Sequence, residues 1–402
     1  MKVAIIGGGA AGFFAAINVK ENYPYAEVTI FEKTSKLLAK VKISGGGRCN
    51  VTNGITSIKE LTAAYPRGGK KLKKAFTIFN TKDAFNWFEK RGVPLLIQND
   101  NCVFPKSQNS QSIIDCFMHE AKRLKIKITC NKSVTQLKSI KDDIQLSFLK
   151  SDDLLFNKVI VATGGSPKRK NLEWLESLGH EISNPVPSLF TFNMPSEKIT
   201  ELMGIVVEKT FVTIQGTKLK ASGPLLITHW GMSGPAILKL SAFGARVLSD
   251  LDYDFKVQVN WVNTLNNNDV MDALVAIAEL HPNKQLSSIK PYKLQTRLWL
   301  YLLNRVNLPV DRKWSETGKK GFNKLVQILT NDIYSVSGKT TFKEEFVTCG
   351  GVSLESINFN TMQSTAVKNL FFAGELLDID GITGGFNFQA AWTTGFIAGK
   401  LK

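Results

Sequence analysis

The sequence predicts an α/β fold in which one domain is built from both ends of the chain and a second domain is inserted between them. An apolar strand pattern at residues 2–6 runs directly into a glycine-rich turn and a helical pattern. The same combination of apolar strand and glycine returns near the C-terminus in VKNLFFAGE, residues 367–375. The stretch between them, from about 190 to 345, has a different pattern, so we expect it to form the insert.

The first elements form a βαβ unit. KVAII (2–6) has the pattern of a buried strand, AAGFFAAINVK (10–20) has helical spacing, and VTIFE (28–32) reads as a second strand. A unit of this kind takes about 30 residues and places its two strands side by side in a parallel sheet.

Helices and then short strands follow in the same domain. We expect one helix over about 68–91 and a second over about 110–124. The apolar stripe of the first helix is expected to contain Leu72, Phe76, Phe79, Phe85 and Phe88. Strands are expected near 126–130, 133–139, 144–149 and 153–162.

The predicted domain boundaries follow the change of pattern. Residues 1–190 and 345–402 are expected to form the split α/β domain, and residues 191–344 the insert. Within the insert, alternating segments such as IVVEKTFVTI (205–214) predict a β-rich part over 191–264, and helical spacing predicts a helical part over 265–335.

Composition excludes several classes of protein. With 43% hydrophobic and 21% charged residues, the chain is an ordinary globular protein and not a disordered one. Five cysteines without a CxxC pair indicate neither a disulfide framework nor a zinc site. The N-terminal apolar run is broken by glycines, and no run of about 18 apolar residues occurs. We therefore expect a cytoplasmic protein with no metal, no signal peptide and no membrane span.

The net charge of +17 leaves the partner open. It is consistent with a solvated basic surface, with RNA or DNA binding, or with attraction of an anionic substrate or nicotinamide phosphate. The basic residues are spread along the chain, with local clusters only in KKLKK (70–74) and PKRK (167–170), and no nucleic-acid motif accompanies them. This favours the solvated surface without excluding nucleic acid.

The turn after the first strand matches GxGxxG. Gly7 permits the tight turn, Gly9 lets backbone approach a pyrophosphate, and Gly12 lets helix and strand pack closely. Glu32 ends the second strand, where an acid hydrogen-bonds the ribose of a dinucleotide. Strand, turn, helix and acid together predict dinucleotide binding.

Two later glycine-marked stretches favour FAD over NAD. VIVATGG (159–165) is a buried strand that ends in small residues, including Thr163 and Gly164, and such an end lets backbone run close to a dinucleotide. The segment 370–399 supplies a strand, a carboxylate at Glu375, and a helix opened by Gly384 and Gly385 with Asn387 near its start. That helix N-terminus would stabilise the negative charge that appears at the N1 and O2 edge of a reduced flavin.

The loop KISGGGRCNVTN (42–53) is interpreted as a wall of the flavin site. Glycines at 45–47, Gly46 among them, would let backbone lie against the cofactor, while Arg48 and Asn50 supply charge and hydrogen bonds. Cys49 has no partner in a CxxC pair, so we expect a small buried loop residue there and not a redox centre.

THWGMSGPAILKLS (228–241) holds the candidate catalytic residue, His229. Ser233 is expected to cap a helix that has Pro235 in its first turn. A histidine just before such a start could donate a proton in a cleft. The alternative is that Thr228 and His229 satisfy backbone groups where the two parts of the insert meet.

Taken together, ISGGGRCNVTN (43–53), VIVATGG (159–165), THWGMSGPAIL (228–238) and AGELLDIDGITGGFNFQAAWTTG (373–395) resemble the YhiN/BaiN-like flavoproteins. That family includes aminoacetone oxidases and a proposed bile-acid enone reductase. The resemblance implies a split Rossmann-type FAD domain of the two-dinucleotide-binding type, with a β-barrel-like and helical insert. It implies FAD contacts at Ala11, Glu32, Lys33, Lys40, Val41, Val134 (by its backbone), Gly374, Glu375 and Asn387.

The expected function is that of an FAD-dependent oxidoreductase. Hydride would pass between flavin N5 and a small organic substrate or NAD(P)H, with the flavin supplying the redox step. No second GxGxxG is present for a dedicated NAD(P)H domain, so a nicotinamide would visit only transiently, or the enzyme is an oxidase. A flavin-dependent RNA-modifying enzyme and a non-catalytic flavin-binding protein remain as alternatives.

Overall fold

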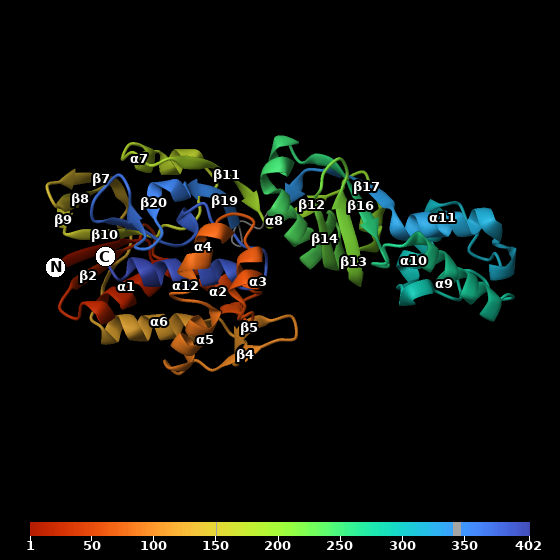
Figure 1. Cartoon of the computed structure of the whole chain (residues 1–402), viewed down its shortest axis with the longest axis horizontal. Coiled ribbons are helices and arrows are strands. Elements are labelled where there is room, and N and C mark those ends of the chain that lie inside the picture. Colours follow the sequence, from red (N-terminus) through yellow and green to blue (C-terminus); the bar gives the residue numbers. More distant parts are fainter. Residues whose placement is uncertain (150, 341–346) are drawn as a thin grey trace. The chain divides into compact units, whose positions relative to one another are not determined.

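The computed structural model describes residues 1–149, 151–340 and 347–402. It divides the chain into two compact units, one made of Met1–Ser188 and Phe342–Lys402 and the other of Leu189–Thr341 (Figure 1). The expected boundary after residue 190 lies close to the division after Ser188. The expected second boundary, between residues 344 and 345, falls outside the described residues.

A seven-stranded sheet forms the centre of the first unit. Its order is β20-β21-β22-β10-β1-β2-β6, and the five strands from β22 to β6 are parallel. The residues of β1 from Val3 to Ile6 are apolar and buried, as expected for a parallel strand that is covered on both faces. The strands are β1 (Lys2–Ile6), β2 (Glu27–Phe31), β6 (Lys127–Thr129), β10 (Lys158–Val161), β20 (Ile357–Asn358), β21 (Gln363–Ser364) and β22 (Leu370–Phe372).

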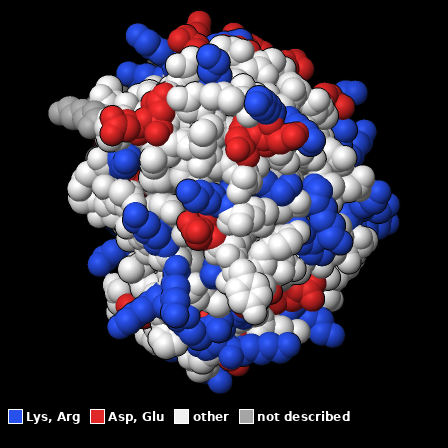
Figure 2. Space-filling model, turned by 90° about the vertical axis from the view of Figure 1, so that its left-hand side faces the viewer, with Lys and Arg blue, Asp and Glu red and all other residues white. Residues whose placement is uncertain are grey.

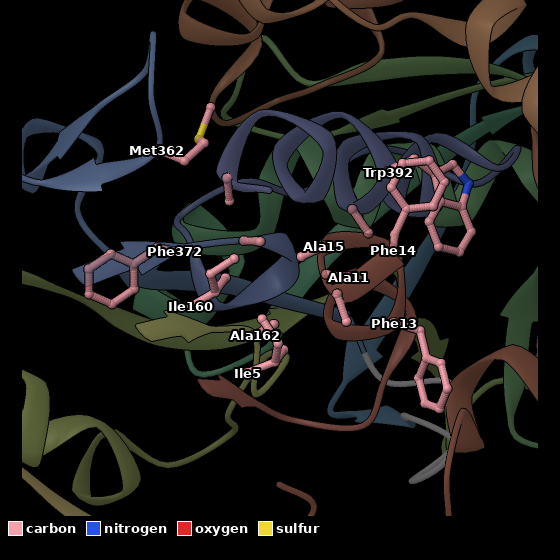
Figure 3. Packing of buried hydrophobic residues seen from close by; sticks show 14 of the residues in the cluster. Ile5, Ala11, Phe13, Phe14, Ala15, Ile160, Ala162, Met362, Phe372 and Trp392 are labelled. Atoms are coloured by element: carbon pink, nitrogen blue, oxygen red, sulfur yellow. The ribbon is translucent and has the colours of Figure 1, made fainter. Parts of the chain in front are cut away.

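Two helices from opposite ends of the chain pack together in this unit. In α1 (Ala10–Asn22) and α12 (Phe386–Ala398) nearly every residue of the middle turns is buried. Figure 3 shows the rings of Phe14 and Trp392 together, with centroids 5.3 Å apart. A Cβ at Gly395 would lie 3.0 Å from the Ala11 carbonyl oxygen, so this glycine lets the two backbones approach.

The predicted helix over 68–91 is wrong in one respect, because it is two helices. They are α4 (Gly69–Ala75) and α5 (Thr81–Glu89). Asn80 starts the second: its side chain accepts from the Lys82 and Asp83 N–H groups, while Asp83 accepts from the Asn80 N–H. Phe76 and Phe79 lie between the two helices and continue the helical spacing of apolar residues. The break therefore cannot be recognised from the apolar pattern. Of the predicted stripe, Phe85 alone is only partly buried.

The predicted strand over 153–162 is also two elements. β9 (Ser151–Phe156) ends before Asn157 and pairs with β8, whereas β10 enters the central sheet. The remaining helices and strands of this unit are α2 (Ala39–Ile43), β3 (Thr52–Asn53), α3 (Ile58–Ala63), β4 (Leu95–Ile97), β5 (Cys102–Pro105), α6 (Gln111–Arg123), β7 (Val134–Ile140), β8 (Asp143–Phe148), α7 (Glu173–Glu176), β11 (Ile182–Ser188) and β19 (Val347–Val352).

The second unit holds an antiparallel sheet and helices. The sheet order is β17-β16-β13-β14-β15-β12-β18. Its strands are β12 (Thr191–Asn193), β13 (Val206–Ile214), β14 (Lys220–Thr228), β15 (Gly231–Ser233), β16 (Asp254–Asn260), β17 (Asp332–Ser337) and β18 (Lys339–Thr340). Its helices are α8 (Pro235–Asp250), α9 (Asn267–Leu280), α10 (Thr296–Arg305) and α11 (Gly318–Thr330). Thus α8 lies within the stretch expected to be β-rich, and the stretch expected to be helical ends in strand β17.

Two global properties bear on partners. Within residues 1–149, 151–340 and 347–402, no helix has the length and apolar character needed to cross a membrane. On the face shown in Figure 2, Lys and Arg side chains form several groups, with Asp and Glu side chains interspersed among them.

Candidate cofactor-binding site

Four parallel strands of the first unit end at one edge of the sheet. Ile6 is in register with Phe31 on one side and with Val161 on the other, and Val161 is in register with Phe372. The loops that begin at residues 7, 32, 162 and 373 therefore start side by side. The chain runs from β1 to β2 in one direction and returns as β10 on the other side of β1. Such a reversal point is where open α/β sheets bind their ligands.

The glycines of the first turn differ in how much space surrounds them. Gly7 has φ +114°, and a Cβ there would lie 2.3 Å from the Ala162 carbonyl oxygen. A Cβ at Gly12 would lie 2.0 Å from the Gly7 carbonyl oxygen. Gly9 has an ordinary backbone (φ −97°), and its Cβ would meet no described protein atom within 4 Å. Gly7 and Gly12 are therefore needed for the turn itself, whereas Gly9 faces the space where a ligand would lie.

Glu32 ties the turn to the end of β2. Its Oε2 accepts the Gly8 N–H (2.9 Å), and its Oε1 accepts the N–H and the hydroxyl of Thr34 (both 2.9 Å). Lys33, between Glu32 and Thr34 in the sequence, is exposed. The Lys132 N–H donates to the Glu32 carbonyl (2.9 Å), so the segment that leads to the half-buried Val134 passes this point. The structure thus brings the residues predicted for the adenosine side together.

Lys40 and Glu375 join segments 335 residues apart. Lys40 Nζ lies 2.6 Å from Glu375 Oε2, and Glu375 Oε1 accepts the Thr348 N–H (3.0 Å). Next to Lys40, Val41 is fully buried and anchors α2. The carboxylate is therefore held by a cation and a backbone donor at the edge of the crevice.

Thr348 is a residue that the sequence reasoning missed. Its hydroxyl is buried and has no hydrogen-bond partner among the described residues. A Cβ at Gly165 would lie 2.5 Å from that hydroxyl and 2.6 Å from Glu375 Oε1. Thr163 is exposed, and Gly164 has φ +75° with no described atom within 4 Å of its Cβ position. No sequence signal marks Thr348, because its place depends on the pairing of β19 with β11.

The glycine loop is built from left-handed backbone. Gly45, Gly46 and Gly47 have φ of +58°, +66° and +83°, and Cβ atoms at the last two would meet nothing within 4 Å. Arg48 stacks on the Phe104 ring (4.1 Å) and donates to the Gly45 carbonyl and to Gln108 (3.3 Å each). Arg48 is thus partly engaged in holding the loop. The Gly47 N–H donates to the Ile43 and Ser44 carbonyls and its own carbonyl accepts the Ser110 N–H, so Gly46 is the more open of the two positions.

Cys49 is fully buried in the same loop. Burial raises the pKa of its thiol to about 12, and a hydrogen bond with Ser44 opposes this only in part. The thiolate that redox exchange needs is therefore not formed near neutral pH. The prediction of a buried loop residue is confirmed.

The loop before α12 is fastened from several sides. A Cβ at Gly385 (φ +85°) would lie 2.2 Å from the Thr52 carbonyl and 2.7 Å from Asn50 Oδ1, and Asn50 itself accepts the Val103 N–H (3.2 Å). Asn387 accepts the Gly381 N–H (2.8 Å) and donates to the Gly381 carbonyl (3.0 Å). Its amide is therefore turned toward its own loop. Gly374 (φ +77°) packs on Ala11, whose methyl a Cβ there would approach to 2.7 Å.

These residues fit a dinucleotide with a flavin end. Both α1 and α12 begin at a glycine, Gly9 and Gly385, and neither has a side-chain cap or an acidic residue in its first turn. Their first N–H groups are therefore available to an anion, and each helix dipole favours negative charge there. Bound at this edge, FAD would place its pyrophosphate at α1, its ribose at Glu32, and its reducible ring system at α12.

His229 lies in the second unit. Its side chain is exposed in the turn between β14 and β15, with its ring 4.1 Å from that of Trp230. The expected cap at Ser233 is wrong: Ser233 ends β15, Gly234 (φ +93°) stands at the cap, and Pro235 begins α8. Strand β15 thus separates His229 from the helix start, and its role as a proton donor stays a prediction.

The chain is similar to a known protein family and to named enzymes over nearly its whole length. A family model described as HI0933-like protein Rossmann domain matches residues 1–401. A 3-dehydro-bile acid delta(4,6)-reductase of Clostridium scindens is 27% identical over 99% of this chain and 98% of its own. A ribosomal RNA dihydrouridine synthase of Haemophilus influenzae is 27% identical over 98% of this chain and 96% of its own.

The fold has a counterpart among solved structures. A 3-ketosteroid-delta4-(5alpha)-dehydrogenase from Rhodococcus jostii superposes with a TM-score of 0.51 and 13% identity, covering 99% of this chain and 96% of its own. The predicted family and fold class are confirmed, and the comparisons agree with the predicted enzyme class, an oxidoreductase of the flavoprotein type.

Proposed function

Because this chain belongs to the HI0933-like protein family, we propose that it is an FAD-dependent oxidoreductase that transfers a hydride between flavin N5 and a small organic substrate or NAD(P)H. The observation that carries the proposal is the pair of uncapped helix starts, at Gly9 and Gly385, on two helices that pack against each other. Bound FAD would supply the hydride chemistry. The chain's own part is to bind, orient and polarise.

Each segment of the site has a separate task in this proposal. The N–H groups at the start of α1 hold the pyrophosphate, and Glu32 accepts hydrogen bonds from the ribose. Lys40 holds the Glu375 side chain in place, so that the carboxylate can accept hydrogen bonds from the cofactor. The start of α12 stabilises negative charge at the pyrimidine edge of the ring system and so favours the reduced state.

The names of the two relatives guide the choice of acceptor. One describes the reduction of a dehydro-bile acid and the other the formation of dihydrouridine, and both are additions of hydrogen to a carbon–carbon double bond. We therefore propose a double bond conjugated with a carbonyl as acceptor, with NADH or NADPH as a transient donor. Amine oxidation with oxygen as acceptor is the competing reaction.

Anaerobic spectroscopy of the purified protein tests this proposal. NADH, NADPH and aminoacetone are mixed with it in turn, and bleaching of the flavin absorbance is followed. An enone or oxygen is then added, and recovery is recorded. We expect bleaching by a nicotinamide and recovery with the enone. Failure to bind FAD would contradict the proposal. Tight FAD binding without turnover by any donor would indicate a non-catalytic flavin-binding protein.

An RNA substrate is the second candidate, favoured by charge. The helix α4 exposes Lys70, Lys73 and Lys74, and the chain carries a net charge of +17. If RNA binds there, its affinity falls steeply with salt, and each lost phosphate contact lowers the logarithmic salt slope by about 0.7–0.9. Lys70→Gln, Lys73→Gln and Lys74→Gln together should flatten that slope and leave FAD affinity unchanged. An unchanged slope would remove α4 from the RNA interface.

A further inference from the structure

The loop that leads into α12, residues 379–386, is held along its length by residues 64–68, which we call the clamp. The Ile382 N–H donates to the Ala64 carbonyl (2.9 Å), and the Tyr65 hydroxyl donates to the Phe386 carbonyl (2.7 Å). Arg67 and Asp380 form an isolated antiparallel bridge. Two segments more than 300 residues apart thus run side by side in opposite directions.

Close packing leaves the clamp little freedom. A Cβ at Gly68 would lie 2.7 Å from Ile379 Cγ1, and one at Gly381 would lie 3.2 Å from the Tyr65 ring. A clamp this close to the loop transmits its own position to the loop backbone. The loop in turn fixes Gly384 and Gly385, at which α12 begins.

A buried ion pair locks the clamp to the loop. Arg67 donates Nε–H to Asp380 Oδ1 (2.6 Å) and Nη2–H to Oδ2, and the Ser188 hydroxyl also donates to Oδ2 (2.6 Å). The Asp380 side chain is completely buried and that of Arg67 is 15% exposed. Burial raises the pKa of Asp380. The Arg67 charge and the hydrogen bonds from Arg67 and Ser188 oppose this rise. Such a two-point contact between a guanidinium and a carboxylate fixes the relative orientation of the two side chains and also pairs their charges.

We propose that Arg67 is a positioning residue for the cofactor site: its two-point contact with Asp380 fixes the loop that sets the start of α12 against the flavin. The inference rests on the proposed function, since that assigns the start of α12 to the cofactor.

The test compares Arg67→Lys with Lys71→Met in the purified flavoprotein. Lysine keeps the positive charge at position 67 but cannot make the two-point contact with the Asp380 carboxylate. Lys71 lies on the neighbouring α4 and pairs with the exposed Glu355, so its loss should cost little. Hydrogen exchange of residues 379–386, the FAD dissociation constant and the flavin midpoint potential are measured for both.

We expect Arg67→Lys to speed exchange in residues 379–386 and to raise the FAD dissociation constant about tenfold, the effect of losing one charge-assisted hydrogen bond. The midpoint potential should also fall, with about 30 mV for each tenfold loss of preference for the reduced cofactor. Lys71→Met should change none of the three. Thermal destabilisation of Arg67→Lys with exchange, affinity and potential equal to those of Lys71→Met would overturn the proposal.

A second variant covers the case in which Arg67→Lys does not fold. Ser188→Ala removes one of the three donors to Asp380 and leaves the ion pair, so it should shift the same measurements in the same direction by less. No change in loop exchange in Ser188→Ala would then count against the clamp. If the unaltered protein binds no FAD, the proposed function fails by itself, while the exchange comparison still decides whether Arg67 orders the loop.

Discussion

At the scale of single residues, the glycines of the first turn have different tasks. Gly7 and Gly12 cannot carry a side chain, because a Cβ would lie 2.3 Å or less from a backbone oxygen. Gly9 has room for a methyl group and a backbone conformation that alanine adopts. The fold therefore does not require a glycine at this position, as the proposed pyrophosphate contact would.

Cys49 should be chemically inert in the folded protein. Because burial raises the pKa of its thiol to about 12, a maleimide at pH 8 should label Cys49 only after unfolding. Mass spectrometry of labelled peptides measures this directly. Cys49→Ala should keep flavin reduction and reoxidation rates close to those of the unaltered protein, and a loss of turnover with FAD still bound would contradict the inert assignment.

His180 should make stability depend on pH on the acid side. The ring is buried, with Nδ1 3.0 Å from the Leu175 carbonyl and Nε2 2.7 Å from the Ser364 hydroxyl. Burial lowers its pKa, and the Leu175 bond opposes this in part. The unfolded chain therefore binds the proton first, so this contribution is complete above about pH 6.5 and is lost as pH falls below it.

Urea unfolding at pH 5.5, 6.5 and 7.5 measures this effect. His180→Gln should be less stable than the unaltered protein at pH 7.5, and the difference should shrink by up to about 1.4 kcal/mol per pH unit below pH 6.5. A difference that stays constant from pH 7.5 to pH 5.5 would show that His180 does not titrate in this way.

At the scale of elements, the glycine loop should act through its open backbone. Gly46→Val introduces both backbone strain, because φ is +66°, and a side chain that points into the proposed flavin space. Gly92→Val is its matched control, since Gly92 has φ +78°, is also open, and lies in the turn between α5 and β4. FAD affinity should fall for Gly46→Val alone, and equal loss in both variants would assign the effect to strain.

Arg48→Ala examines the other side of the same loop. It removes the stacking on Phe104 and the bond to Gly45, so we expect weaker flavin retention with little change in overall stability. FAD release on dilution measures it. An Arg48→Ala protein that retains flavin like the unaltered protein would mean that the loop is held by other contacts.

Sequence periodicity predicted helices and strands well where a continuous apolar pattern determines them. The βαβ unit, α6 and the strands β7 and β8 lie close to where the pattern placed them, because each buries one continuous apolar pattern. It failed at breaks decided by single residues. Asn80 splits one predicted helix, and Gly234 with a left-handed backbone replaces Ser233 as the start of α8.

At the scale of the whole molecule, the candidate site is assembled from both ends of the chain. Local motifs identified the glycine turn, Glu32, the glycine loop and the start of α12. Pairing across long sequence distances could not be predicted. Lys40 with Glu375, Thr348 with Gly165, and Arg67 with Asp380 are contacts between N-terminal and C-terminal segments, which meet through β22 in the central sheet and through β19 on β11. His229, in the other unit, remains a prediction from sequence alone.

The measurement that tests the central claim most directly is a titration of FAD into the unaltered protein and into Gly9→Ala. We expect one FAD per chain in the unaltered protein. Gly9→Ala should keep its unfolding temperature, since a Gly-to-Ala change at a compatible position alters stability by only about 0.4–1 kcal/mol. Its FAD affinity should nevertheless drop by at least about tenfold, or about 1.4 kcal/mol, because the new methyl group occupies the place of the pyrophosphate. Equal FAD affinity in the two proteins would contradict the assignment of this edge as the cofactor site.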